Sequence, residues 1–236
     1  MGRVLVLRHH EEDHAGLIGE AFVARGYELD VVMMNEATPT PSVEGYDALL
    51  ILGSSNAVYD HEVERAWFGC ELDVIAESGQ RGVPVLGICF GAQALCLFHG
   101  GRVTPSNEPE IGWYRIEVVP GVELDAGPWF EFHFDRMELP AGAQLWATSP
   151  RAVQAFVVGR NVGVQFHPEI DDAQLRDWLA SAAESAREFG HDIEELLAQT
   201  AREVPAARLR ADRLVALFLR HAGLASDDTG ARATLH

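Results

Sequence analysis

Short apolar runs alternate with amphipathic stretches along the first half of the chain. The runs have the length of buried strands, and the stretches between them repeat their apolar residues at helical spacing. We expect strands over residues 4–7, 28–34, 48–52 and 83–88, and helices over 17–25 and near 61–79. Strands that are apolar throughout and separated by helices are typical of a largely parallel sheet covered on both faces.

The pattern changes in the middle of the chain to short β-like segments separated by Gly, Pro, Asn and Asp. We expect these strands over 111–119, 129–134, 144–148, 152–158 and 161–166. Their spacing predicts antiparallel hairpins, the last of which leads directly to His167.

Beyond residue 171 the apolar positions return to helical spacing, as Leu175, Trp178 and Leu179 illustrate. Asp171 or Asp172 is a suitable cap for the first of these helices, and the tail after Gly223 is expected to fray. The apolar stripe is interpreted as core rather than as a partner surface. No internal repeat or low-complexity linker marks a second domain, so residues 171–236 are expected to form a helical extension packed on a domain of residues 1–170.

The charge balance limits the possible partners. The net charge is -18, from 36 acidic residues against 18 basic ones, and every basic residue is Arg. Such a surface repels phosphate groups, so neither nucleic acid nor an anionic membrane surface is an expected partner. The four-residue apolar run near the N-terminus is too short for a signal peptide or a membrane span. Three cysteines indicate free thiols in a reducing compartment, so we expect a cytoplasmic protein, with Cys70 and Cys96 as buried small hydrophobes.

The strongest chemical signal begins at the strand of residues 83–88. This strand is followed by Gly-x-Cys-x-Gly centred on Cys89, the pattern of a nucleophile held at a sharp turn between a strand and a helix. A thiol needs a base to become a thiolate, and the base needs a third group to fix its ring. His167 and Glu169, in the segment Gly-Val-Gln-Phe-His-Pro-Glu, supply both, which predicts a Cys-His-Glu triad.

Both segments resemble the motifs of class I, triad-type glutamine amidotransferases, G-x-C-x-G-x-Q and G-x-Q-F-H-P-E. The residues near 110–113, around His133 and at 154–156 also resemble the free-standing members of this family that are similar to the amidase part of GMP synthase. The likeness covers roughly residues 3–220. We therefore expect a flavodoxin-like three-layer α/β sandwich with a mixed, mostly parallel sheet and a C-terminal helical extension.

The resemblance implies that Cys89 is the nucleophile, His167 the base and Glu169 the carboxylate that orients it. It also implies that Gln93 contacts the side chain of glutamine. The oxyanion would be held by the backbone N–H of Phe90 and by one from the loop at Gly53 and Ser54. That loop usually reads Gly-Gly-Pro in the family, whereas this chain has Gly-Ser-Ser-Asn. Because Ser tolerates a positive φ less well than Gly, the departure predicts an altered loop with a misdirected donor; a plain polar turn is the alternative.

Other residues have weaker claims to the site. His133 lies in a stretch that the family places near the active-site rim, although a hydrogen-bonded structural histidine explains it equally well. Trp113 is a candidate for lining the glutamine pocket, although a packed hydrophobe is the favoured interpretation. The cluster of His, Glu and Asp at residues 9–14 could bind a divalent metal on paper, but its spacing matches no known site. We interpret it as a solvated loop and expect neither a metal nor a cofactor.

The function implied is hydrolysis of the glutamine amide through a Cys89 thioester, which gives glutamate and ammonia. The sequence contains no Walker A loop to cradle ATP, so the ammonia would pass to a separate acceptor or synthetase subunit. A first alternative is a hydrolase of γ-glutamyl peptides or amides, similar to plant γ-glutamyl peptidases. A second is a non-catalytic interaction subunit that retains the fold. The PfpI group, which shares the cysteine elbow, lacks the His-Pro-Glu segment.

Overall fold

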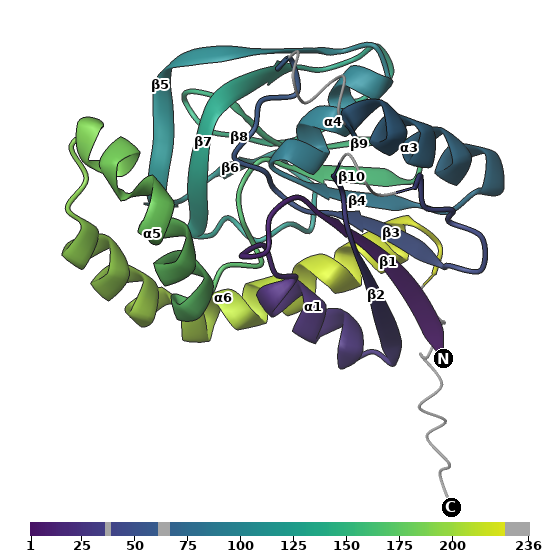
Figure 1. Cartoon of the computed structure of the whole chain (residues 1–236), viewed down its shortest axis with the longest axis horizontal. Helices are drawn as coiled ribbons and strands as arrows, with labels where there is room; N and C mark the ends of the chain where they lie inside the picture. The colour runs from purple at the N-terminus through teal and green to yellow at the C-terminus, as the bar shows by residue number, and fades with distance from the viewer. Residues whose placement is uncertain (36–38, 61–66, 225–236) are drawn as a thin grey trace, which may run out of the picture.

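The computed structural model describes residues 1–35, 39–60 and 67–224 (Figure 1). Within these residues eight strands form one sheet in the order β2-β1-β3-β4-β10-β9-β8-β6, and two further strands form the separate ribbon β5-β7. The strands are β1 (Gly2–Arg8), β2 (Tyr27–Met33), β3 (Ala48–Ile51), β4 (Val85–Ile88), β5 (Arg102–Tyr114), β6 (Glu117–Val118), β7 (Trp129–Glu138), β8 (Gln144–Thr148), β9 (Val153–Val158) and β10 (Asn161–Val164). The helices are α1 (Gly16–Val23), α3 (Gly69–Arg81), α4 (Phe90–Phe98), α5 (Asp172–Glu188) and α6 (Ile193–His221).

The sheet is parallel from β2 through β10 and antiparallel from there to β6. Successive residues of β1 alternate between two hydrophobic cores: Val4 and Val6 join the core beneath α1 and α6, while Leu5 and Leu7 join the core beneath α3 and α4. Both faces of the sheet are therefore covered, and β3 and β4 consist entirely of buried residues without polar side chains because neither face meets water. This arrangement confirms the expected flavodoxin-like three-layer sandwich.

One predicted strand was wrong in its extent. The strand expected over 111–119 begins at Arg102 as β5 and ends at Tyr114, and the short β6 follows it. Pro105 and Pro109 read as loop residues in the sequence, and a register shift between Pro105 and Glu110 accommodates them against β7. Because only tertiary pairing with β7 makes this segment a strand, periodicity could not find it.

The C-terminal helices begin at acidic caps. The Asp171 carboxylate accepts a hydrogen bond from the Gln174 N–H at 2.9 Å, and Asp192 accepts from Glu194 and Glu195 at the start of α6. In Figure 1, α6 runs along the lower side of the molecule and contacts both α1 and α5, while α5 stands beside the β5-β7 ribbon. Of the helix expected near 61–79, the structure has α3, and residues 61–66 lie outside the described residues, as does the tail from 225. None of the described helices is long and apolar enough to cross a membrane.

Candidate active site

Cys89 stands at the turn between β4 and α4. Its backbone has φ 49° and ψ -102°, and among the described residues no other non-glycine residue has a positive φ. Such a conformation is costly and persists only where the surroundings impose it. Here the Cys89 N–H donates to the Val164 carbonyl at 2.8 Å, and a side chain at Gly91 would collide with the Ile51 backbone. The turn therefore presents the thiol outward from the end of the sheet.

The other two cysteines differ from Cys89. Cys96 is buried, as expected, and burial raises the pKa of its thiol to about 11. Cys70 is only partly buried, so the expectation of a fully buried side chain was wrong for it. Neither residue lines the cavity described below.

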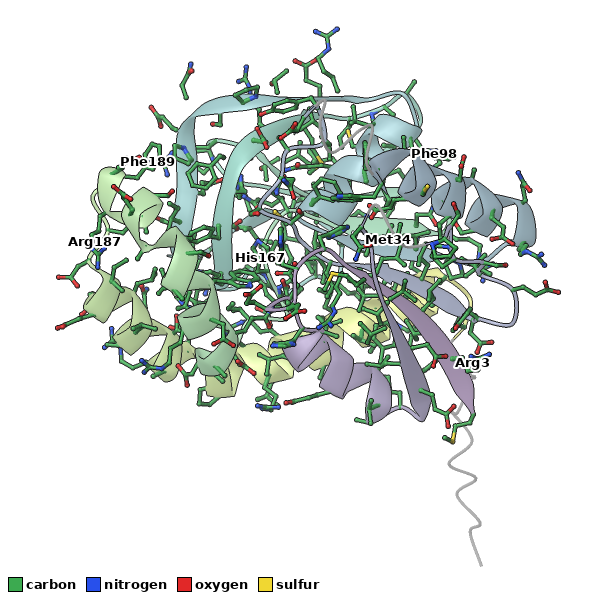
Figure 2. All side chains as sticks on the ribbon, in the orientation of Figure 1. Arg3, Met34, Phe98, His167, Arg187 and Phe189 are labelled. Carbon is green, nitrogen blue, oxygen red and sulfur yellow. The ribbon has the colours of Figure 1, made fainter. Side chains whose placement is uncertain are left out.

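His167 follows β10 and is held on three sides. Its backbone N–H donates to the Phe130 carbonyl at 2.7 Å, and its Nδ1 lies 2.7 Å from the Glu169 carboxylate. The Trp178 ring packs edge-on against the imidazole, with centroids 4.9 Å apart. Since Glu169 occupies Nδ1, Nε2 is the ring nitrogen left for a second partner. In the view of Figure 2 the residue lies in the interior of the molecule, whereas Arg187 and Phe189 mark the outer end of α5.

The imidazole of His167 and the Cys89 side chain meet over Gly53. A Cβ placed on Gly53 would lie 2.9 Å from Cε1 of His167 and 3.7 Å from Cβ of Cys89. Burial alone would lower the pKa of His167, but the charges of Glu169 and Cys89 outweigh it and raise the pKa well above its ordinary value. The raised pKa favours the protonated ring, which lies where a Cys89 thiolate would be its counter-ion.

Two buried amides connect the helix and the last strand. Gln93, which is 3% exposed, donates to the Gln165 Oε1 at 3.2 Å, and Gln165 donates to the Cys89 sulfur at 3.4 Å. Gln93 was predicted to contact the glutamine side chain, whereas no role was predicted for Gln165. Its place within the Gly-Val-Gln-Phe-His-Pro-Glu segment, two residues before His167, was the available signal.

His133 is buried between two carboxylates at the edge of the site. Its Nε2 lies 3.3 Å from oxygens of both Glu110 and Glu131, and its Nδ1 donates to the Asp135 carbonyl at 2.9 Å. Burial lowers the pKa of His133, but the two carboxylates outweigh it and raise the pKa to about 10. The residue thus lines the cavity, with one ring nitrogen hydrogen-bonded to the backbone and the other in ion pairs whose geometry makes no hydrogen bond.

The loop after β3 is ordered by its own polar side chains. The Ser54 hydroxyl donates to Asn56 Oδ1 and accepts from the Asn56 N–H, each at 3.1 Å, and the Ser55 hydroxyl lies 2.9 Å from Nε2 of His10. No positive φ occurs at Ser54 or Ser55. Neither serine therefore carries the strain of the left-handed region, and the predicted misdirection of the loop's donor stays a prediction.

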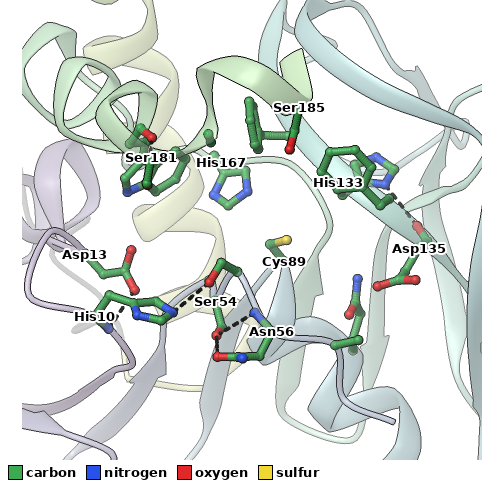
Figure 3. A pocket seen from close by; sticks show the side chains of 18 of the residues that line it. His10, Asp13, Ser54, Asn56, Cys89, His133, Asp135, His167, Ser181 and Ser185 are labelled. Atoms are coloured by element: carbon green, nitrogen blue, oxygen red, sulfur yellow. Dashed lines mark hydrogen bonds between the residues drawn. The ribbon is translucent and has the colours of Figure 1, made fainter. Parts of the chain in front are cut away.

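These residues surround one cavity of about 790 Å³ (Figure 3). In Figure 3, Cys89 and His167 face the cavity between the loop of Ser54 and His133, and Gln93 also lines it. The α5 helix supplies a wall that sequence analysis missed, formed by Asp177, Trp178, Ser181, Ala182 and Ser185. Four lining residues are acidic, and among the described lining residues none is Lys or Arg; the acidic ones are Glu12, Asp13, Asp135 and Asp177.

Two expectations are corrected by the packing. Trp113 does not line this cavity: its ring is buried under α6, where its Nε1–H donates to the Thr200 hydroxyl at 2.8 Å. The segment 9–14 is not simply a solvated loop, because the side chains of His9 and Asp13 are buried. Among the described residues, no cluster of three or more His, Cys, Asp or Glu side chains could hold a metal ion.

Comparison with known proteins assigns the chain to a family. The family model of class I glutamine amidotransferases matches residues 14–177. The chain belongs to the class I glutamine amidotransferase family. It is 35% identical over 135 residues to the glutamine-hydrolysing GMP synthase of Rhizobium johnstonii, a match that covers 52% of this chain and 24% of that one. With the GMP synthase of Helicobacter pylori it shares 30% identity over 165 residues, which cover 65% and 30% of the two chains.

A solved glutamine amidotransferase from Thermotoga maritima superposes with a TM-score of 0.83 at 27% identity, covering 94% of this chain and 98% of that one. This amidotransferase chain thus matches that structure along nearly its whole length. By contrast, the matches span less than a third of the curated GMP synthases.

Proposed function

We propose that this class I amidotransferase chain hydrolyses the side-chain amide of glutamine, with Cys89, His167 and Glu169 as its catalytic triad. The observation that carries the proposal is the joint placement of the strained Cys89 and of a His167 ring fixed through Nδ1 by Glu169. A nucleophile on a sharp turn, a base and an orienting carboxylate are the three parts that amide cleavage through a covalent intermediate requires.

In the first half-reaction, the Cys89 thiolate attacks the γ-carbonyl carbon of glutamine. The negative charge that develops on the carbonyl oxygen is held by the backbone N–H groups of Ser54 and Phe90. His167 then gives its proton to the amide nitrogen, the carbon–nitrogen bond breaks, and ammonia leaves. The product on the enzyme is a γ-glutamyl thioester of Cys89.

In the second half-reaction, the now neutral His167 takes a proton from a water molecule, which attacks the thioester carbon. The carbon–sulfur bond breaks, glutamate leaves, and the thiolate and imidazolium are restored. Glu169 keeps the ring in one orientation through both halves and stabilises its charged form. The released ammonia would then serve a separate acceptor or synthetase subunit, a hypothesis prompted by the likeness to GMP synthases.

A second candidate is a hydrolase of γ-glutamyl amides or peptides. The cavity of about 790 Å³ favours it, because pockets of this size enclose ligands much larger than glutamine. The acidic lining would also suit a substrate whose leaving group carries a positive charge. The two candidates share the same Cys89 thioester and differ only in the amine released.

The deciding experiment is intact-protein mass spectrometry after brief incubation with glutamine and with a panel of γ-glutamyl peptides and amines. We expect a γ-glutamyl adduct that disappears in Cys89→Ala and persists in the control Cys70→Ala. Steady-state release of ammonia from glutamine is then compared with release of amine from the γ-glutamyl compounds. Fast release of amine by the chain alone would replace the first candidate with the second. An absence of any adduct would favour a non-catalytic interaction subunit.

A further inference from the structure

His9 is a buried histidine that the proposed reaction does not use. It follows β1, and its side chain is completely enclosed. Its Nε2 lies 2.7 Å from the Glu71 carboxylate, and its Nδ1 lies 2.8 Å from the carbonyl oxygen of Gly53. The ring stacks on Trp67 at a centroid separation of 4.7 Å and leans on Phe90 at 4.9 Å. The imidazole is therefore held by two polar partners and two aromatic rings.

Both polar partners of this ring are acceptors. A neutral imidazole has one N–H and one bare nitrogen, so it could donate to only one of them. Donation to Gly53 and Glu71 together needs a proton on each nitrogen, with the Glu71 carboxylate as counter-ion. Burial lowers the pKa of His9, but the charge of Glu71 outweighs it and leaves the pKa raised.

The hydrogen bond from His9 to the Gly53 carbonyl also sets the direction of the Ser54 N–H, which belongs to the same peptide unit. Because the peptide unit is planar and trans, the Gly53 carbonyl and the Ser54 N–H point in opposite directions. With the carbonyl held by His9, the Ser54 N–H points away from His9, and both Gly53 and Ser54 line the Cys89 cavity. No residue that the structure describes accepts a hydrogen bond from this N–H.

We propose that His9, clamped by Glu71, is a positioning residue that fixes the Gly53–Ser54 peptide so that the Ser54 N–H serves as an oxyanion donor. This role rests on the proposed function, and it gives His9 and Glu71, which lie outside the triad, a part in catalysis. It also explains how the Gly-Ser-Ser loop keeps the Ser54 N–H in place without the second glycine that is usual in the family. The restraint comes from the His9 side chain, at the end of another strand, and not from the loop's own sequence.

Two isosteric variants separate this role from a merely structural one. In His9→Asn the amide nitrogen occupies the place of Nδ1 and can still donate to the Gly53 carbonyl. In His9→Gln it occupies the place of Nε2 and can donate only to Glu71. Both variants lose the ring's packing on Trp67 and Phe90, so they serve as controls for each other.

We expect His9→Gln to lower kcat about 10²-fold with little change in KM, the size of effect seen when one oxyanion donor is lost. His9→Asn should lose at least roughly tenfold less. Alkylation of Cys89 by iodoacetamide should proceed at similar rates in both variants, because displacement at that carbon develops no oxyanion. Equal losses of kcat in the two variants would overturn the proposal.

Crystal structures of the wild type and the two variants test the same point without any substrate. The Gly53–Ser54 peptide should keep its orientation in His9→Asn and rotate in His9→Gln. An unrotated peptide in His9→Gln would refute the role of His9, whatever the enzyme acts on. Wild-type protein that turns over no γ-glutamyl compound would instead refute the proposed function, and the peptide comparison would still decide the role of His9.

Discussion

The backbone of Gly53 lies directly against the imidazole of His167. A Cβ at this position would come within 2.9 Å of the ring's Cε1, closer than real carbon atoms approach. The position of the proposed base is thus set partly by a missing side chain on a neighbouring strand end. The carbonyl of the same glycine accepts a hydrogen bond from His9, so Gly53 contacts both the proposed base and the proposed positioning residue.

Replacement of Gly53 by Ala should therefore displace His167 and reduce kcat/KM by about 10²-fold, since a shift near 1 Å in a catalytic group can cost that much. Steady-state kinetics on the best γ-glutamyl substrate would measure it. Gly79→Ala is the matched control, because Gly79 lies in α3 with nothing within 4 Å of a new Cβ. The control should leave activity unchanged, and a Gly53→Ala enzyme of full activity would contradict the contact's importance.

The members of the proposed triad should differ in their effects. Cys89→Ala should abolish turnover, because no other group can form the thioester. Glu169→Gln should cost less than the ~10⁴-fold typical of a serine triad, because a thiol ionises far more readily than a hydroxyl and depends less on its base. Rates of ammonia or amine release, with thermal melting to check folding, would measure both; losses of equal size would refute this division of roles.

The proton on His133 should persist into alkaline solution. Its pKa is raised from 6.5 to about 10 by Glu110 and Glu131, so the protonated ring stabilises the fold fully below pH 6.5 and loses this contribution as the pH rises towards 10. An NMR titration of the histidine ring protons would follow it. His99 and His191, whose pKa values burial lowers, are internal controls and should lose their protons first. A midpoint for His133 near pH 6.5 would show that the ion pairs do not form in solution.

Trp113 should matter for stability and not for substrate. Thr200→Val leaves the indole N–H without its acceptor and should lower the free energy of unfolding by about 1–3 kcal/mol. Adding Trp113→Phe removes the unpaired donor, so the double variant should lose less than the sum of the single ones. Chemical denaturation measures these energies. A change of KM in Thr200→Val would indicate that Trp113 contributes to substrate binding after all.

The α5 wall should control the size of the leaving group. Ser185 is exposed on α5 and lines the cavity, so Ser185→Phe should narrow it without disturbing the core. If γ-glutamyl peptides are the substrates, kcat/KM for them should fall at least roughly tenfold while that for glutamine stays within twofold, because one lost or added group in a pocket is worth about 10–200-fold. Equal effects on large and small substrates would argue that the leaving group does not reach α5.

The sequence by itself determined the features that depend on neighbours in the chain. Apolar runs located most strands and both C-terminal helices, the cap at Asp171 was visible, and the motifs at Cys89 and His167 identified the family, now confirmed. These signals can be read from the sequence because strand periodicity, helix periodicity and sharp turns each depend on only a few adjacent residues.

Only the tertiary structure decided the features that depend on residues brought together from afar. The sequence left His9 in a polar cluster, yet pairing of β1 with β3 and the position of α3 bury it between Gly53 and Glu71. The strand status of 102–110, the separation of Trp113 from the cavity and the wall made by α5 have the same origin. A side chain's burial and partners are set by which segments pack on it, and no local pattern records that choice.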